Sequence, residues 1–246
     1  MKTCAGFWGA AAACLAGLAA GAGVGDGRTA MRYTVRRVEA AALETVDFSR
    51  AEVGRLGQVR PESSAHRPEV AFRVVHDGEN LYVRFDVEDR FVRSVQTAYQ
   101  SPVCTDSCVE FFVEPVAGRG YFTFEVNAGG VLLLYYIEDA TRVPGGFARF
   151  TKVPEAWGRR VEIRSSLPAV VEPEVAGPVT WQMRYKVPVA LFEAFAGPVA
   201  CGGGAVWRGN FYKCGDKTSH PHWLSWAPVT SLNFHLPACF GTLTLE

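Results

Sequence analysis

The sequence predicts an all-β protein, an antiparallel β-sandwich of the jelly-roll type with a few short helical turns. Short runs of alternating apolar and polar residues recur along the chain between Gly, Pro, Asp and Asn residues, which is typical of sandwiches and barrels. No sustained helical period interrupts these runs. Hydrophobic residues make up 48% of the chain and charged residues 20%, as expected for a folded globular protein. No break in composition divides the chain, so residues 31–246 are predicted to form a single domain.

Residues 1–30 precede the first strand pattern and are rich in Ala and Gly. Lys2 is followed by an apolar stretch to about Ala22, whose small residues fit a signal-peptide cleavage site. A signal peptide would place the protein in the periplasm or outside the cell, whereas a translation start at Met31 would leave it in the cytoplasm. The stretch is too short and too rich in glycine for a membrane span, which needs about 20 apolar residues.

The first strands are predicted from alternation and turn residues. The sequence that begins at Met31 alternates as a strand does. A β-hairpin between Val70 and Val87 is the clearest element, because two alternating runs flank a turn that contains Asp77 and Gly78.

The later elements follow the same pattern. Strands are expected at residues 108–114, 121–127, 131–137, 160–165, 179–187, 206–212 and 241–245. Pro188 ends one of them, residues 189–195 are expected to form a helical turn, and the prolines of residues 165–178 indicate a loop.

Strand alternation also predicts which side chains share a face, because successive side chains of a strand point to opposite sides. The core-facing set is Leu81, Val83, Phe85, Val87, Val109, Phe111, Val113, Phe122, Phe124 and Val126. The outward set includes Tyr82, Arg84, Glu110, Glu125 and Asn127. Solvent exposure alone would explain any one polar strand face, but this mixture of acids, amide, guanidinium and ring favours a ligand. Sugar hydroxyls both donate and accept hydrogen bonds, so carboxylates, amides and Arg pair with them.

The carboxyl-terminal segment adds further candidate contacts. Asn210 and Lys213 are predicted as polar contacts, and Tyr212, Trp223 and Trp226 as surfaces on which the apolar face of a sugar ring stacks. Trp223 and Trp226 lie in a stretch without strand alternation, and loop residues often contact ligands.

Four motifs resemble the family 9 carbohydrate-binding modules and their stand-alone relatives. They are DSCVEFFVEP (106–115), YFTFEVN (121–127), GNFYKCGD (209–216) and CFGTLTLE (239–246), and the similarity spans residues 70–246. The resemblance implies a DOMON-like β-sandwich without catalytic activity that binds a mono- or oligosaccharide in carbohydrate catabolism. It also implies structural calcium nearby and a ligand-contacting role for Glu110. Where attached modules carry one of two sugar-stacking tryptophans this chain has Cys104, and Tyr99 is the nearest upstream ring.

The net charge and the cysteine spacing argue against nucleic-acid binding and against a metal-thiolate site. The formal net charge is zero, with 25 basic and 25 acidic residues, so the chain lacks the field that attracts nucleic acid. The cysteines beyond the leader are Cys104, Cys108, Cys201, Cys214 and Cys239. They form no CxxC pair, which favours ordinary thiols over a metal-thiolate site. We expect a monomer.

Several alternatives stay open at this point. Glu110 and Glu125 on neighbouring strands could serve a glycoside hydrolase, which needs two carboxyl groups about 5 to 10 Å apart. A haem or other cofactor within the sandwich would need an axial ligand such as Met183. The group Asp216, Ser219, His220 and His222 is a weak candidate for acyl transfer because no GxSxG elbow is present. His222 and His235 are weak candidates for metal ligands, since such histidines are usually structural.

Overall fold

The structure is a computed structural model that describes residues 31–246, so the predictions for the leader lie outside the described residues. The first strands are β1 (Arg32–Arg37), β2 (Gly54–Arg55), β3 (Gln58–Val59), β4 (Glu69–His76), β5 (Asn80–Asp89), β6 (Val92–Ser94), β7 (Cys108–Glu114) and β8 (Tyr121–Asn127). The later ones are β9 (Leu132–Val143), β10 (Gly146–Lys152), β11 (Glu162–Ser165), β12 (Val171–Val175), β13 (Val179–Pro188), β14 (Val206–Cys214), β15 (Trp223–Ser225) and β16 (Gly241–Leu245). The helical elements are η1 (Val103–Thr105), α1 (Glu155–Gly158), α2 (Val189–Ala196) and η2 (Pro237–Cys239).

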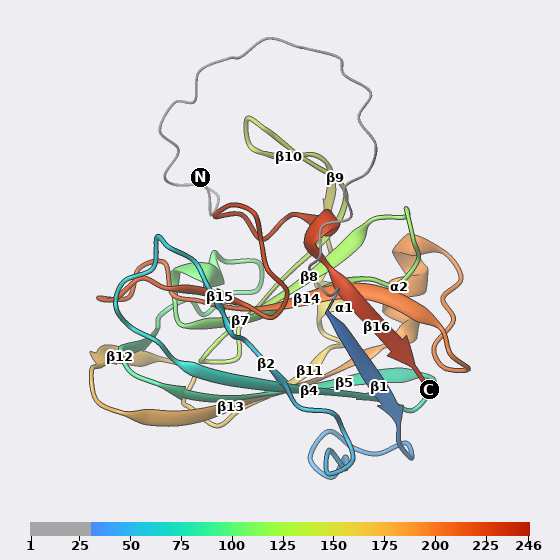
Figure 1. Cartoon of the computed structure of the whole chain (residues 1–246), viewed down its shortest axis with the longest axis horizontal. Coiled ribbons are helices and arrows are strands. Elements are labelled where there is room, and N and C mark those ends of the chain that lie inside the picture. Colours follow the sequence, from blue (N-terminus) through green and yellow to red (C-terminus); the bar gives the residue numbers. More distant parts are fainter. Residues whose placement is uncertain (1–30) are drawn as a thin grey trace.

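The strands form two layers, as the sequence predicts (Figure 1). The hydrogen-bonded order is β10-β9-β8-β7-β14-β16-β1-β4-β5-β13-β11. We call β7, β8, β9, β14 and β16 with their neighbours the upper sheet, and β4, β5, β13 and β11 the lower sheet. Strand β1 joins them, because its first residues pair with β16 and its last residues pair with β4. Both pairings of β1 are parallel, a departure from the predicted antiparallel arrangement.

The predicted hairpin is confirmed as β4 and β5. These strands pair in antiparallel register from Glu69 opposite Glu88 to His76 opposite Leu81. The turn between them is fixed by Asp77, whose carboxylate accepts hydrogen bonds from the backbone N–H groups of Glu79 and Asn80, and Gly78 adopts a positive φ of 100°.

Aromatic rings dominate the core between the two sheets. Phe211 of β14 stacks on Phe72 of β4 with a centroid distance of 3.6 Å and on Phe111 of β7 at 4.5 Å. The apolar faces predicted from alternation on β5, β7 and β8 all belong to this core. Burial of these rings holds the upper sheet against the lower sheet and fixes which side of β7 and β8 faces away from the core.

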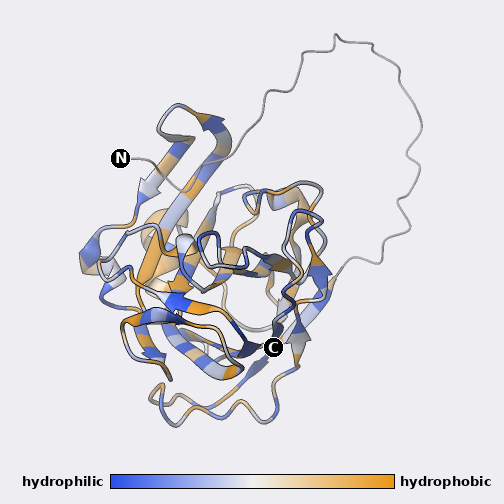
Figure 2. Cartoon of the chain, turned by 90° about the vertical axis from the view of Figure 1, so that its left-hand side faces the viewer, coloured by the Kyte–Doolittle hydropathy of each residue, from blue (hydrophilic) through white to orange (hydrophobic). Residues whose placement is uncertain are grey.

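Several regions differ from the sequence-based prediction. Trp223 was placed in a stretch without strand alternation, but it begins the short strand β15, which pairs with β14 and β3. Residues 165–178 were predicted as a loop, but they contain β12, which pairs with β6 in a separate small sheet. Pro173 is tolerated there because β12 lies at a sheet edge, where a missing N–H removes no essential ladder bond. A strand was predicted at residues 131–137, but β9 continues to Val143 and is followed by β10, which was not predicted. The two strands form a hairpin that extends beyond the body of the sandwich (Figures 1 and 2).

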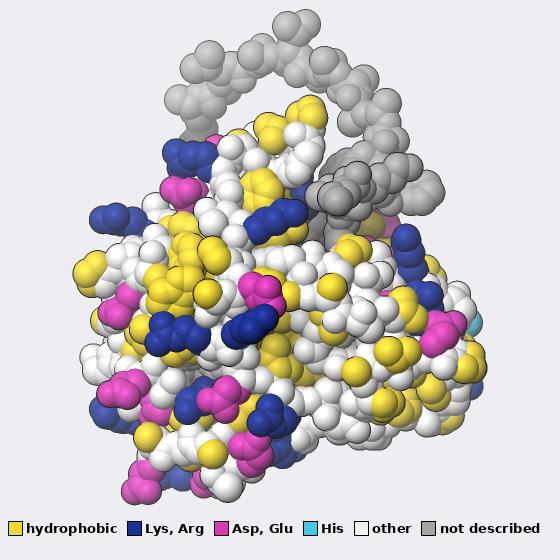
Figure 3. Space-filling model, turned by 180° about the vertical axis from the view of Figure 1, so that it is seen from behind, with side chains coloured by type: hydrophobic (Ala, Val, Ile, Leu, Met, Phe, Trp, Pro, Cys, Tyr) yellow, Lys and Arg dark blue, Asp and Glu magenta, His cyan; other side chains and the backbone are white. Residues whose placement is uncertain are grey.

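The described surface carries both signs of charge. Figure 3 shows Lys and Arg side chains interspersed with Asp and Glu side chains over the back face. Within residues 31–246, no helix is long and apolar enough to cross a membrane.

Candidate functional site

Glu110 and Glu125 lie directly opposite each other on β7 and β8, on the side of the upper sheet that faces away from the core. Their side chains are only 2% and 6% exposed. Burial raises the pKa of Glu110 to about 8, and the nearby Asp216 carboxyl adds to this effect. Burial and the Glu110 carboxyl raise the pKa of Glu125 well above its usual value. Both shifts favour the protonated, neutral forms of the two carboxyl groups.

Two cysteine thiols flank Glu110 on the same face. Cys108 and Cys214 are directly opposite each other on β7 and β14, and both are buried. The Cys214 thiol donates a hydrogen bond to Glu110 Oε1 at 3.0 Å. Burial raises the pKa of Cys108 to about 12, so both the thiol and the adjacent carboxyl are neutral.

Three aromatic side chains surround this group and are half-buried. Trp223, Tyr135 and Phe234 pack against the cluster that contains Cys108 and Cys214. The Trp223 indole N–H donates to Asp216 Oδ1 at 2.7 Å, which orients the ring. We call Glu110, Glu125, Tyr135, Trp223 and Phe234 the Glu110 face.

The Glu110 face is more covered than the sequence suggested. Phe234, from the segment before β16, stacks on Tyr212 with a centroid distance of 4.0 Å, and the Tyr212 hydroxyl donates to the Phe234 carbonyl oxygen. Tyr212 is fully buried by this contact. Strand alternation could have identified Tyr135, which shares a face with Leu133 and Ile137, but the irregular segment around Phe234 carries no periodic signal.

The two predicted amide contacts have hydrogen-bond partners within the protein. Asn127 Nδ2 donates to the Asp106 carboxylate at 2.9 Å, and its Oδ1 accepts from the Val131 N–H. Asn210 bonds the backbone of Ala227 through both Nδ2 and Oδ1. Both side chains are fully buried, so they support the site's framework and offer little to a ligand.

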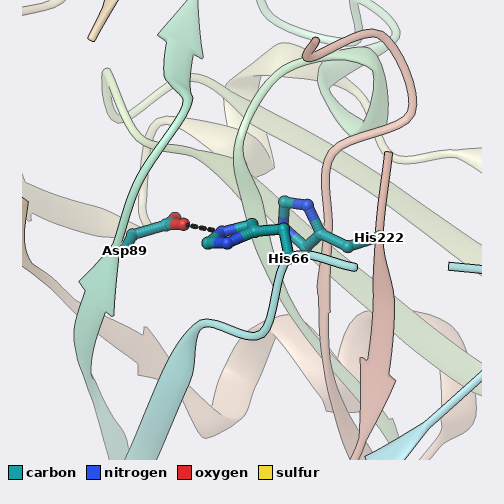
Figure 4. A group of neighbouring side chains, drawn as sticks. All are labelled: His66, Asp89 and His222. Carbon is teal, nitrogen blue, oxygen red and sulfur yellow. Dashed lines mark hydrogen bonds and ion pairs between the residues drawn. The ribbon is translucent and has the colours of Figure 1, made fainter. Parts of the chain in front are cut away.

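Lys213 points into the core rather than toward the Glu110 face. Its ammonium lies 3.2 Å from Asp89 Oδ2 and 2.7 Å from His222 Nε2. His222 donates through Nδ1 to the His220 carbonyl oxygen, so its Nε2 accepts from the ammonium. Burial and the Lys213 charge lower the pKa of His222 to about 3. Figure 4 shows His66 beside Asp89, whose Oδ1 lies 2.7 Å from His66 Nε2.

Three other predicted contacts lie away from the Glu110 face. Arg84 is on the lower sheet, where it forms an ion pair with Asp86. The Tyr99 hydroxyl donates to the Val153 carbonyl oxygen at 2.8 Å. Trp226 is 4% exposed and packs edge-on against Phe72 in the core, so it is not a surface for stacking.

The residues of the acyl-transfer alternative do not form a triad. Ser219 donates a hydrogen bond to Glu174 of β12, and its oxygen lies 2.9 Å from His220 Nδ1. His220 stacks on Phe91 with a centroid distance of 3.6 Å. Asp216 accepts a hydrogen bond from the Trp223 indole, and His222 accepts one from the Lys213 ammonium. The four side chains therefore make separate structural contacts.

The remaining alternatives rest on buried residues. His235 lies 3.2 Å from the Tyr121 hydroxyl, and burial lowers the pKa of this histidine well below its usual value. Met183 is fully buried among the core residues of the lower sheet.

An open hollow of about 350 Å³ lies elsewhere, at the end of β1. It is lined by Arg36, Arg37, Arg50 and Glu246, and Arg36 forms an ion pair with Glu246. The hollow contains none of the predicted site residues.

Sequence comparison identifies the family. Residues 40–245 match the family described as carbohydrate-binding family 9. The chain belongs to this family. No curated protein matches the chain in sequence.

Solved structures of similar fold include carbohydrate-binding family 9 proteins. A candidate carbohydrate-binding protein from Bacteroides uniformis has 31% sequence identity and a TM-score of 0.77, and the match covers 89% of this chain and 100% of that one. A family 9 module from Caldicellulosiruptor kristjanssonii in complex with cellotriose has 14% identity and a TM-score of 0.60, over 88% of this chain and 94% of the module. The glucose complex has 14% identity and a TM-score of 0.57, over 88% and 96%.

Proposed function

We propose that the chain binds a mono- or oligosaccharide at the Glu110 face without chemically altering it. The observation that carries this proposal is the pair of neutral carboxyl groups, Glu110 and Glu125, beside three half-buried aromatic rings. Membership of carbohydrate-binding family 9 supports sugar binding, and the geometry supports this location.

The chemistry of the face suits a polyol. A protonated carboxyl group donates through its O–H and accepts through its carbonyl oxygen, which matches the two roles of a sugar hydroxyl. The rings of Trp223 and Tyr135 offer flat apolar surfaces for the C–H groups of a pyranose. Glu125, which is more exposed than Glu110, is the carboxyl group that a sugar would reach first.

The same carboxyl pair argues against hydrolysis. Glycoside hydrolases require one carboxyl group as an acid and a second one ionised as nucleophile or base. Burial raises the pKa of Glu110 to about 8, and burial together with the Glu110 carboxyl raises the pKa of Glu125 well above its usual value. These shifts work against an ionised nucleophile or base at this face.

Glucose and short β-linked glucans are the first ligands to test, because family 9 modules of similar fold are known in complex with glucose and cellotriose. A role in carbohydrate catabolism and structural calcium remain expectations from the resemblance. Export depends on the leader, and sequencing the amino terminus of the native protein would show whether the mature chain starts after a cleaved signal peptide or at Met31.

Isothermal titration with glucose, cellotriose and a panel of other sugars tests the proposal. We expect Trp223→Ala to abolish the binding heat, whereas Trp157→Ala should leave it unchanged. Trp157 is a matched control because it is also half-buried, yet it lies on α1 beside Arg160. No binding heat with any sugar of the panel, or an equal loss of sugar affinity in both variants, would refute binding at this face.

A further inference from the structure

Cys108, Glu110 and Cys214 offer ligand atoms that all lie within 4.8 Å of one another. The strands impose this grouping, since Cys108 and Glu110 are two residues apart on one face of β7 and Cys214 is opposite Cys108 on β14. The Cys214 sulfur is already 3.0 Å from Glu110 Oε1. A zinc–sulfur bond is about 2.3 Å and a zinc–oxygen bond about 2.0 to 2.2 Å, so small side-chain adjustments would bring the three atoms onto one ion.

The chemical surroundings suit a metal ion at this position. Asp216 and Glu125 add two further carboxyl groups beside Glu110. A buried acidic group avoids the cost of its charge either by keeping a proton or by binding a metal ion. A divalent cation would take the place of the protons on the two thiols and on Glu110.

We propose that Cys108, Glu110 and Cys214 bind one Zn²⁺ ion. Two thiolates and one carboxylate are ligands that Zn²⁺ accepts, and three protein ligands leave the fourth tetrahedral position to water or another oxygen. Thiolates select against Ca²⁺ and Mg²⁺, which take oxygen ligands. Binding releases three protons to solvent, two from the thiols and one from the carboxyl group, with no change in oxidation state.

A second group of potential metal ligands in the described residues differs from the cysteine group, because a lysine already lies beside it. His66, Asp89 and His222 also offer ligand atoms that lie within 4.8 Å of one another. There the Lys213 ammonium already contacts two of the three groups, at 3.2 Å from Asp89 Oδ2 and 2.7 Å from His222 Nε2. The positive charge that a metal would supply is therefore built into the protein at that group, whereas no ammonium of residues 31–246 is bonded to the ligand atoms of the cysteine group.

Metal analysis of the purified full-length chain tests the proposal. The protein is prepared with a thiol reductant, supplied with Zn²⁺, separated from free metal by gel filtration and assayed by mass spectrometry of the elements. We expect about one zinc ion per chain, and at least about a tenfold lower content in the Cys108→Ser/Cys214→Ser variant. The matched control is Cys201→Ser/Cys239→Ser, which alters two free cysteines outside the cluster and should keep its zinc.

Cobalt substitution gives a readout that does not depend on the variants' folding. Co²⁺ bound by two thiolates in a tetrahedral site produces a sulfur-to-metal charge-transfer band and intense visible bands in the wild-type protein. Glu110→Gln should keep that band and weaken the affinity, because the amide is a poorer ligand than the carboxylate.

Absence of zinc, absence of the charge-transfer band, or zinc retained by the double serine variant would each overturn the proposal. So would a disulfide between Cys108 and Cys214, detected as resistance to alkylation before reduction. Zinc would ionise Glu110 and leave Glu125 as the neutral carboxyl group that meets a sugar. Sugar titration of the zinc-loaded and of the chelator-treated protein is therefore a separate measurement. A chain that binds zinc but no sugar would refute the proposed function alone, and the reverse result would refute the zinc site alone.

Discussion

Glu110 and Glu125 are direct cross-strand neighbours, and each carboxyl group is almost completely buried. Like charges directly opposite each other destabilise a sheet. The pair avoids this repulsion by remaining protonated, since burial moves both pKa values upward. Its protonation thus links the stability of the upper sheet to pH.

In metal-free protein, Glu110→Gln should remove part of the pH dependence of stability. The unfolded chain releases the Glu110 proton near 4.5 and the folded chain near 8. Between these values the folded state binds more protons, so the free energy of unfolding of the wild type falls as pH rises. We expect the variant to gain stability relative to the wild type between pH 5 and 8, on the order of a few kcal/mol.

Urea unfolding at several pH values in the presence of a chelator measures this difference. Glu88→Gln is the control, because Glu88 is exposed on β5 and should not alter the profile. Parallel profiles for the wild type and Glu110→Gln would contradict the prediction.

Trp223 and Trp226 should respond differently to replacement by alanine, although only two residues separate them. Trp226 is part of the core, so Trp226→Ala should lower the free energy of unfolding by about 3 to 5 kcal/mol. Trp223 is half-buried beside Cys108 and Cys214, so Trp223→Ala should cost less stability and abolish sugar binding. Denaturant unfolding and titration calorimetry on both variants check this, and a greater loss of stability in Trp223→Ala would count against the assignment.

Lys213→Met should be strongly destabilising. Removing the ammonium leaves the Asp89 carboxylate buried without its cation, which costs about 3 to 5 kcal/mol. The double variant Lys213→Met/Asp89→Asn should recover part of this loss. Lys186→Met is the control, since its ammonium is 3.8 Å from the half-exposed Glu162 and such pairs contribute about 1 kcal/mol or less. Thermal and urea unfolding measure the stability of these variants. An equal loss of stability in Lys213→Met and Lys186→Met would contradict the buried ion pair.

Arg84→Ala should leave sugar binding unchanged. Arg84 lies on the lower sheet with Asp86, on the opposite layer from the Glu110 face. Its removal breaks a half-exposed ion pair, so we expect a stability change of about 1 kcal/mol or less. A large loss of sugar affinity in titration calorimetry would move the binding surface to the lower sheet.

The strand pattern alone predicted much of the fold. The bounds of β7, β8 and β16 agree with the predicted residues 108–114, 121–127 and 241–245. These strands could be predicted because one face of each is buried in the core, which enforces a strict period of two. The β12 strand was missed because its pattern is interrupted by Pro173 and it pairs with the short β6.

The site was harder to predict because alternation shows which side of a strand a residue faces and not what covers that side. Glu110 and Glu125 face the predicted direction, yet loop residues bury them. Lys213 shares its strand face with Phe211, and its partner Asp89 comes from β5, far away in the sequence. A buried lysine becomes plausible only when that distant carboxylate is known, and no local pattern reveals it.

Strand β1 pairs in parallel with β16, so the first and last described strands are hydrogen-bonded neighbours. The upper sheet cannot be completed until β16 has emerged from the ribosome, because Arg32 pairs with Thr242. Contacts between residues so far apart in sequence slow folding. Until β16 docks, the free edges of β1 and β14 are open to other chains, so low temperature and dilution should improve the recovery of native protein on refolding.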